Sequence, residues 1–155
     1  ARRGADGGLR SCRHNLQYWR NQPYLGFGPG AHGFAGGART MNVGGIQPFV
    51  DRCMQSGGAG LVFPSSHATR RTIPVDRWTE MQETMMTGLR LIQEGISEAD
   101  FARRFGEPLE AVFGTQIAQL VQLGLLEWSG QEERRVRLTR RGCLVGNQVF
   151  MQFVG

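Results

Sequence analysis

The sequence predicts an α+β protein built from two dissimilar parts, residues 1–73 and residues 74–155. The first part holds 14 of the 23 glycines and only short apolar runs, whereas in the second part apolar residues recur at helical spacing. The first part carries nine arginines against two acidic residues, and the second carries nine against eleven, so the net charges are +7 and −2. Composition, periodicity and charge therefore all change near Pro74, which predicts a domain boundary there.

Two helices are expected at the start of the second part. Asp76 can cap a helix over residues 76–94, and Gly95 suits a left-handed C-terminal cap. Ser97-Glu-Ala-Asp resembles a capping box, with Asp where Glu or Gln is usual, and it begins a short helix that Gly106 ends. A glycine just past each apolar stretch is the expected stop signal of a helix.

A third helix and two strands follow. Pro108 fits the first turn of a helix that runs to about residue 124, with Gly114 as a point where it could break. Residues 124–128 and 136–139 are typical of two strands joined by a polar turn, and a last helix comes after them. Three helices and a two-stranded wing predict a winged-helix-like domain.

A winged helix raises the hypothesis of DNA binding, in which the third helix enters the major groove. The polar side chains of residues 107–124 include two glutamates and no arginine. Because phosphate contacts dominate DNA affinity, such a helix is a poor DNA reader. Five arginines between residues 134 and 141 favour nucleic-acid binding, but a solvated charged face explains them as well. We therefore expect no nucleic-acid partner.

The segment YLGFGPGAHGF at residues 24–34 has the Gly-x-Gly-x-x-Gly spacing of a dinucleotide-binding fingerprint. That fingerprint requires a strand, a tight turn and a helix whose N-terminus holds a pyrophosphate. Residues 24–27 suit a strand, but Gly36 and Gly37 stand where the helix would begin. No Gly-Lys-Ser/Thr follows, so a P-loop is excluded as well. These glycines are expected to serve another purpose.

The composition indicates a cytoplasmic protein. Cys12, Cys53 and Cys143 are odd in number and widely spaced, which argues for a reducing compartment rather than a disulfide framework. The sequence shows no leader peptide and no apolar run long enough to cross a bilayer, and it does not address peripheral membrane association. All 18 basic residues are arginines, whose forked donors suit carboxylates and phosphates.

Two motifs in the first part carry a family resemblance. CRHNLQYW at residues 12–19 contains His-Asn-x-x-Tyr-Trp, and YLGFGPGAHG follows five residues later. The likeness continues in RTMN at 39–42, MMTGLRLIQEGI at 85–96, LVQLGLLEW and VRLTRRGCLVGNQVF. Together these segments resemble the radical SAM haem chaperones, a family also described as oxygen-independent coproporphyrinogen III oxidase-like. The resemblance spans nearly the whole chain in the right order.

The resemblance implies a fold for both parts. Residues 1–73, too poor in apolar pattern to form a core alone, would be the end of a radical SAM partial (β/α) barrel. Residues 74–155 would be the winged-helix-like domain, acting as a covering and interaction module. The glycine-rich stretch would lie at the cofactor-facing mouth of the barrel, where glycines let the backbone approach a bulky ligand. The cofactor-binding residues implied there are Gly26, Gly28, Gly30, Ala31 and His32.

The resemblance also implies that His14, Asn15, Tyr18 and Trp19 bind haem, with His14 as the iron ligand and the rings packed on the porphyrin. From the residues alone, a single histidine is more often structural. His32 lines the same cavity or, equally, hydrogen bonds to the loop backbone. Three arginines near these motifs meet carboxylates of the cofactors or simply aid solubility. They are Arg13, Arg20 and Arg39.

The family holds a [4Fe–4S] cluster with a Cys-x-x-x-Cys-x-x-Cys run, and the three cysteines of this sequence lack that spacing. The cluster and most of the S-adenosylmethionine site are therefore expected upstream, and this stretch is not expected to be a competent enzyme alone. The leading hypothesis is a C-terminal fragment of a haem chaperone that delivers haem to a haemoprotein. The alternatives are a fragment of a true coproporphyrinogen III oxidase and a winged-helix nucleic-acid-binding protein.

Overall fold

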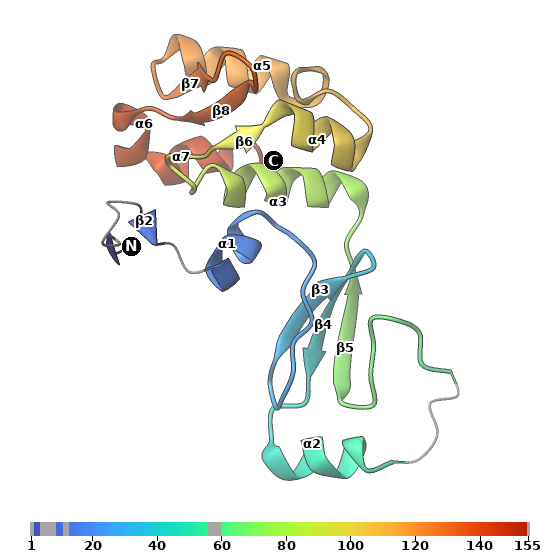
Figure 1. The fold of residues 1–155 in the computed structure, drawn as a ribbon. Coiled ribbons are helices and arrows are strands. Elements are labelled where there is room, and N and C mark those ends of the chain that lie inside the picture. Colours follow the sequence, from blue (N-terminus) through green and yellow to red (C-terminus); the bar gives the residue numbers. More distant parts are fainter. Residues whose placement is uncertain (1, 4–8, 11–12, 56–59, 155) are drawn as a thin grey trace. The chain divides into compact units, whose positions relative to one another are not determined.

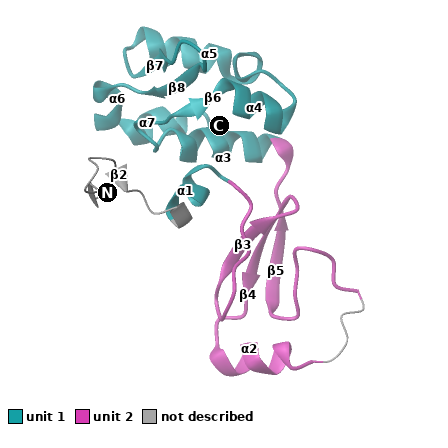
Figure 2. Ribbon diagram, viewed as in Figure 1, with its two compact units in different colours: residues 1–21, 78–155 teal, residues 22–77 magenta. Residues whose placement is uncertain are grey.

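The computed structural model describes residues 2–3, 9–10, 13–55 and 60–154, with side chains from Asn15 onward. It divides into two compact units (Figure 2). One, called here the helical unit, comprises residues 1–21 and 78–155, and the other, the sheet unit, comprises residues 22–77. The predicted division after residue 73 differs from this grouping, because residues 13–21 lie with the C-terminal part of the chain.

The helical unit combines helices with a small antiparallel sheet (Figure 1). Its three longest helices are α3 (Arg77–Gly88), α4 (Glu98–Phe105) and α5 (Leu109–Gln122). The sheet has the order β6-β8-β7, with β6 at Ile96–Ser97, β7 at Leu126–Ser129 and β8 at Arg135–Leu138. Helix α1 (Arg13–Trp19), the paired strands β1 (Arg2–Arg3) and β2 (Leu9–Arg10), and helices α6 (Arg140–Leu144) and α7 (Gly146–Met151) complete it.

Local capping sets both ends of α4 and the start of α6. Ser97 is the N-cap of α4, and its hydroxyl accepts a hydrogen bond from the backbone N–H of Asp100 at 3.1 Å. Gly106 ends α4 in the left-handed conformation, with φ of 69°. Thr139 caps α6 in the same manner as Ser97, accepting from the backbone N–H of Gly142 at 2.9 Å. These boundaries are those expected from the sequence.

Three expectations for the helices differ from the structure. Helix α3 ends at Gly88, six residues before the predicted end, and turns lead from there to Gly95. Helix α5 runs unbroken through Gly114, because one glycine costs a helix less than its packed apolar face contributes. The single last helix is instead two, α6 and α7, which meet at Val145 with φ of −122°.

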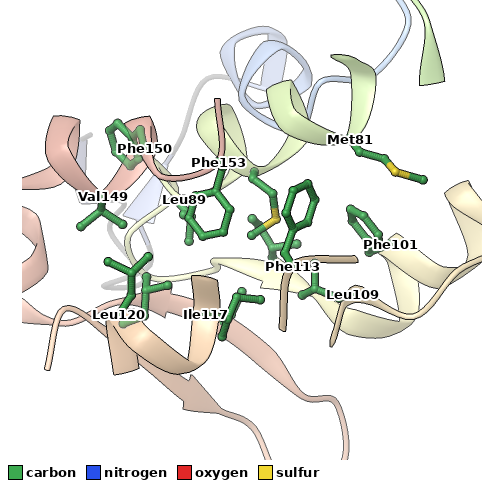
Figure 3. Close-up of a cluster of buried hydrophobic side chains, with 14 of the residues drawn as sticks. Met81, Leu89, Phe101, Leu109, Phe113, Ile117, Leu120, Val149, Phe150 and Phe153 are labelled. Carbon is green, nitrogen blue, oxygen red and sulfur yellow. The ribbon is translucent and has the colours of Figure 1, made fainter. Parts of the chain in front are cut away.

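The hydrophobic core of the helical unit gathers side chains from α3, α4, α5, α7 and the sheet (Figure 3). Phe113 of α5 lies in this cluster and contacts three other rings. Its centroid is 5.5 Å from that of Trp78, 6.1 Å from that of Phe101 and 5.6 Å from that of Phe153. Phe113, Leu109 and Leu89 are fully buried. The apolar stripes predicted on these helices therefore face one another.

The sheet unit contains a three-stranded antiparallel sheet, β3-β4-β5, and helix α2 (Ile46–Cys53). Its strands are β3 (His32–Ala35), β4 (Ala38–Asn42) and β5 (Thr69–Pro74). Gly36 and Gly37 join β3 to β4 in a two-residue hairpin, with φ of 55° and 69°. Positive φ at both positions is the type I′ turn that favours glycine. The two glycines that ruled out a nucleotide-binding helix thus form a hairpin.

The predicted strand at residues 24–27 is only a single antiparallel bridge, between Tyr24 and Phe34. The chain leaves the extended conformation at Gly28 and Gly30, whose φ angles are 101° and 68°. The strands of this sheet pair antiparallel, whereas the strands of a (β/α) barrel are parallel. The described part of the sheet unit therefore does not show barrel pairing.

Candidate functional site

Helix α1 carries the His-Asn-x-x-Tyr-Trp motif, and the residues after it attach the helix to α3 and α4 within the helical unit. The attachment depends on Asn21, which is 7% exposed and adopts a positive φ of 49°. Its amide donates to the carbonyl of Glu80 at 3.4 Å and to the hydroxyl of Thr84 at 3.2 Å. Asparagine is among the residues that tolerate the left-handed conformation. A single residue at this position can therefore both turn the chain at the end of the segment and hydrogen bond to α3.

Two arginines strengthen this attachment. Arg104 of α4 pairs with Glu80, with 2.6 Å between Nη2 and Oε1, and also donates to the backbone carbonyls of Arg20 and Asn21 at 3.2 and 2.5 Å. Arg20 forms a bidentate pair with Glu94, in which both hydrogen bonds measure 2.9 Å. The hydrogen bond with Glu94 raises the pKa of Arg20 above its ordinary value. The carboxylate-binding edge of Arg20 is therefore already occupied.

The two aromatic residues of the motif are partly open to solvent. Tyr18 is 38% exposed and Trp19 is 39% exposed, and Asn15 is exposed as well. The guanidinium of Arg90 lies over the Trp19 ring, 5.7 Å from its centroid. Position 14 belongs to the backbone of α1, one turn before Tyr18. The side chains of His14 and Arg13 lie outside the described residues.

The glycine-rich loop belongs to the sheet unit and is organised by Asn42, the last residue of β4. Asn42 is 8% exposed, and its amide donates to the carbonyls of Gly26 at 3.3 Å and Gly28 at 3.1 Å. The backbone N–H of Asn42 donates to Ala31 at 2.9 Å, and that of Gly30 donates to Val43 at 2.7 Å. One buried side chain thus holds the loop on the edge of the hairpin.

Glycine is required at position 26 for space rather than for φ. A Cβ atom there would lie 2.2 Å from the carbonyl oxygen of His32. The His32 side chain itself is exposed, at the first residue of β3, and Phe27 beside the loop is 86% exposed. The predicted site residues therefore fall into two groups, one on α1 in the helical unit and one on the loop of the sheet unit.

A pocket of about 420 Å³ lies in the helical unit, between the turn after α3 and the α6–α7 corner. Arg90 provides its charge, and the guanidinium also lies 4.7 Å from the ring centroid of Phe150. Most of the other side chains around it are apolar. They include Ile92, Leu138, Val145 and Phe150, together with the thiol of Cys143.

The described residues do not fit an iron–sulfur cluster, which needs several thiolates converging on one site. Cys53 lies in α2 of the sheet unit and Cys143 in α6 of the helical unit, and both are free. Cys12 lies outside the described residues. Across the ranges that the structure describes, no three His, Cys, Asp or Glu side chains gather as metal ligands, and no helix is long and apolar enough to cross a membrane.

Two residues at these places, Arg90 and Asn42, were not predicted as site residues. Both stand in segments that carry the family resemblance, Arg90 in MMTGLRLIQEGI and Asn42 in RTMN. The feature that could have indicated Arg90 is its position as a cation between Leu89 and Leu91 in a mostly apolar stretch. For Asn42 the signal was an amide at an inward position of the strand. Neither signal reveals a partner, because each contact spans many residues of sequence.

Comparisons with known proteins agree with the resemblance. The family model described as HemN C-terminal domain matches residues 75–145. The heme chaperone HemW of Bacillus subtilis is 39% identical over 151 residues, which make up 97% of this chain and 36% of that protein. The heme chaperone HemW of Lactococcus lactis is 28% identical over 142 residues, 92% of this chain and 34% of that protein.

One solved structure has a similar fold. Coproporphyrinogen III oxidase (HemN) from Escherichia coli, a radical SAM enzyme, matches with a TM-score of 0.55 over 85% of this chain and 28% of its own, at 17% sequence identity. This likeness concerns the fold alone. The chain spans about a third of the length of the two HemW relatives.

Proposed function

We propose that this chain, which is homologous to the heme chaperones HemW and to HemN-like radical SAM proteins, is the C-terminal part of a haem chaperone that binds haem and delivers it to a haemoprotein. The carrying observation is the α1 segment. Its motif presents Tyr18 and Trp19 partly exposed on a helix. Asn21, Arg20 and Arg104 fix that helix to α3, to α4 and to the turn between them.

The chemistry of this segment suits haem as a bound cargo. A porphyrin is a large apolar plane, and half-exposed aromatic rings can pack against it without first leaving a core. Position 14 lies one turn from Tyr18 on the same side of α1, so an imidazole there can ligate the iron beside the ring. A helix anchored at its end loses little conformational entropy when it binds such a ligand.

The remaining parts of the proposal rest on the family. The glycine loop, with Gly26, Gly28, Gly30, Ala31 and His32, would approach a cofactor of the radical SAM barrel, and the C-terminal domain would be winged-helix-like. The [4Fe–4S] cluster would require cysteines beyond those described, and most of the S-adenosylmethionine site would lie with that cluster. Two free thiols, Cys53 and Cys143, support a reducing compartment such as the cytoplasm.

Haem titration followed by visible absorbance tests the proposal. We expect saturable binding of one haem per chain, and we expect His14→Ala to move the Soret band, because loss of an axial imidazole changes the ligand field of the iron. His67→Ala, in a turn of the sheet unit, is the matched control and should leave the spectrum unchanged. His32→Ala should have an intermediate effect if the glycine loop reaches the haem.

The outcomes separate the hypotheses. If His14→Ala leaves affinity and spectrum untouched while His32→Ala abolishes binding, the iron ligand belongs to the glycine loop. If neither substitution matters, the alternative of a coproporphyrinogen III oxidase fragment gains over the chaperone. If the unsubstituted chain binds no haem at all, the proposed role of the α1 segment is wrong.

A further inference from the structure

The pocket between the turn after α3 and the α6–α7 corner combines one cation with apolar side chains and with two amides, those of Asn147 and Gln148. Its volume, about 420 Å³, falls in the ordinary range of small-molecule sites. Leu138 and Phe150 are buried in the core behind it, whereas Ile92 is 53% exposed at its side. Such a mixed lining suits the edge of a ligand where an anionic group joins an apolar body.

Arg90 is the residue of this pocket whose charge and position suit it to bind an anion. Its guanidinium lies 4.7 Å from the centroid of Phe150 and 5.7 Å from that of Trp19. Contact with two ring faces positions a guanidinium while leaving N–H groups at its edge for a planar acceptor. No carboxylate among the described residues lies within 4.0 Å of it, and Glu94, four residues further along the chain, is held in the bidentate pair with Arg20.

We propose that Arg90 binds a propionate of the haem and that the pocket receives this carboxylate edge of the porphyrin. The inference rests on the proposed function. It connects two features of the helical unit, because the ring that Arg90 contacts is the Trp19 ring of the haem-binding motif. A porphyrin packed near Trp19 therefore has beside it a guanidinium that no carboxylate of the described residues occupies.

The other arginines near the motifs are less suited to this role. Arg20 is bidentate to Glu94, and Arg104 is paired with Glu80 and with two backbone carbonyls. Arg39 lies in the sheet unit, with its guanidinium 5.3 Å from the Phe34 ring centroid. Arg90 is thus the cation of the helical unit that combines an aromatic support, a pocket and a free carboxylate-binding edge within the described part of the chain.

The test compares haem with haem dimethyl ester, in which both propionates are capped, by absorbance titration of the 155-residue chain. The variants are Arg90→Met, which keeps an apolar stem, Arg90→Lys, which keeps the charge, and Arg141→Ala. Arg141 is exposed on α6 and forms no ion pair with any described residue, so it controls for general loss of charge. Circular dichroism confirms that each variant is folded.

We expect Arg90→Met to weaken haem binding about tenfold, to leave the affinity for the dimethyl ester unchanged, and to be partly rescued by lysine. Arg141→Ala should match the unsubstituted chain for both ligands. The inference is overturned if Arg90→Met binds haem as tightly as the unsubstituted chain, or if it weakens both ligands equally. In either case saturable haem binding would still support the proposed function, whereas its absence would remove both.

Discussion

At the scale of single residues, the attachment of the motif helix depends most on Asn21. Its buried side-chain amide makes two hydrogen bonds to α3. Its backbone adopts the left-handed conformation, which most other residues avoid. Nothing in the sequence around Asn21 signals this, because Glu80 and Thr84 lie about sixty residues away along the chain. The exposed aromatic pair could be identified by its motif, but the way it is held could not.

We predict that Asn21→Ala lowers the free energy of unfolding by about 2 kcal/mol, since it removes buried hydrogen bonds and leaves an unfavourable φ. Urea unfolding followed by circular dichroism measures this change. Asn15→Ala is the matched control, because Asn15 is exposed on α1, the helix that Asn21 follows, and it should change the stability by less than about 0.5 kcal/mol. Equal effects of the two substitutions would contradict the role given to Asn21.

At the scale of elements, features set by residues close in sequence could be predicted, whereas contacts between distant residues could not. Helix α4 begins after Ser97 and ends at Gly106, as expected, because a helix cap depends on residues within one turn. The pairing of β6 with β8, by contrast, joins Ile96 to Val136, and no local pattern specifies that partner. The glycine pair at the hairpin was correctly judged unsuitable for a helix, but the strands that it joins were not predicted.

Helix α5 offers a direct test of why Gly114 does not break it. A Cβ atom at this position would meet only the Cβ of Glu110, at 3.9 Å. We therefore predict that Gly114→Ala raises the free energy of unfolding by about 0.5–1 kcal/mol, the difference in helix propensity between the two residues. Thermal unfolding measures this increase as a higher Tm.

Gly142→Ala is the opposite case, because its Cβ would lie 2.0 Å from the carbonyl oxygen of Leu125. It should lower the stability of the same unit by about 1–3 kcal/mol. A destabilised Gly114→Ala variant would show that the helix needs the flexibility of glycine at this position.

The cap of α4 also couples to the polar turn between β7 and β8. The Ser97 hydroxyl donates to Glu133 at 2.7 Å, and this bond, followed by that from Arg135, holds the pKa of Glu133 below its ordinary value of 4.5. A carboxyl group whose pKa is lowered by folding stabilises the fold above the unfolded value. That contribution disappears as the pH falls through the folded value.

We predict that Ser97→Ala raises the pKa of Glu133 toward 4.5, as measured by NMR titration, and costs about 1 kcal/mol of stability at neutral pH through loss of the cap. The part of this loss that comes from Glu133 should vanish in acid, while the part from the Asp100 N–H should persist. Ser97→Thr keeps the hydroxyl and should behave nearly as the unsubstituted chain. An unchanged Glu133 titration in Ser97→Ala would show that Arg135 alone sets its pKa.

At the scale of the whole molecule, the predicted site residues are divided between two units. The sequence had placed all of them in one part, residues 1–73. Tyr18 and Trp19 precede the glycine loop by only a few residues, yet they belong to the unit formed with residues 78–155. The cause is the set of contacts that Arg20 and Asn21 make with α3, with Arg104 of α4 and with Glu94 in the turn after α3. Sequence proximity suggested one cavity, whereas the long-range hydrogen bonds assign the motif helix to the C-terminal domain.

The ion pairs around the wing bear on the hypothesis of nucleic-acid binding. The arginines near the wing were the features that favoured it, and several of them are paired with acids in the structure. Arg134 contacts Glu98 and Glu110, and its hydrogen bond with Glu110 raises its pKa. The other two pairs join Arg135 to Glu133 and Arg137 to Glu127. An arginine held by a carboxylate must break that pair before it can neutralise a phosphate.

We therefore predict that duplex DNA binds weakly, without sequence preference, and is released at physiological salt, as fluorescence anisotropy over a salt series would measure. Residual binding should come from the net charge of +7 on residues 1–73, which favours polyanions without reading their sequence. Gln119→Ala and Gln122→Ala, on the exposed face of α5, should leave the affinity unchanged, because we expect this helix not to enter a groove. Tight binding at physiological salt that either substitution weakened would make α5 a recognition helix and the C-terminal domain a DNA reader.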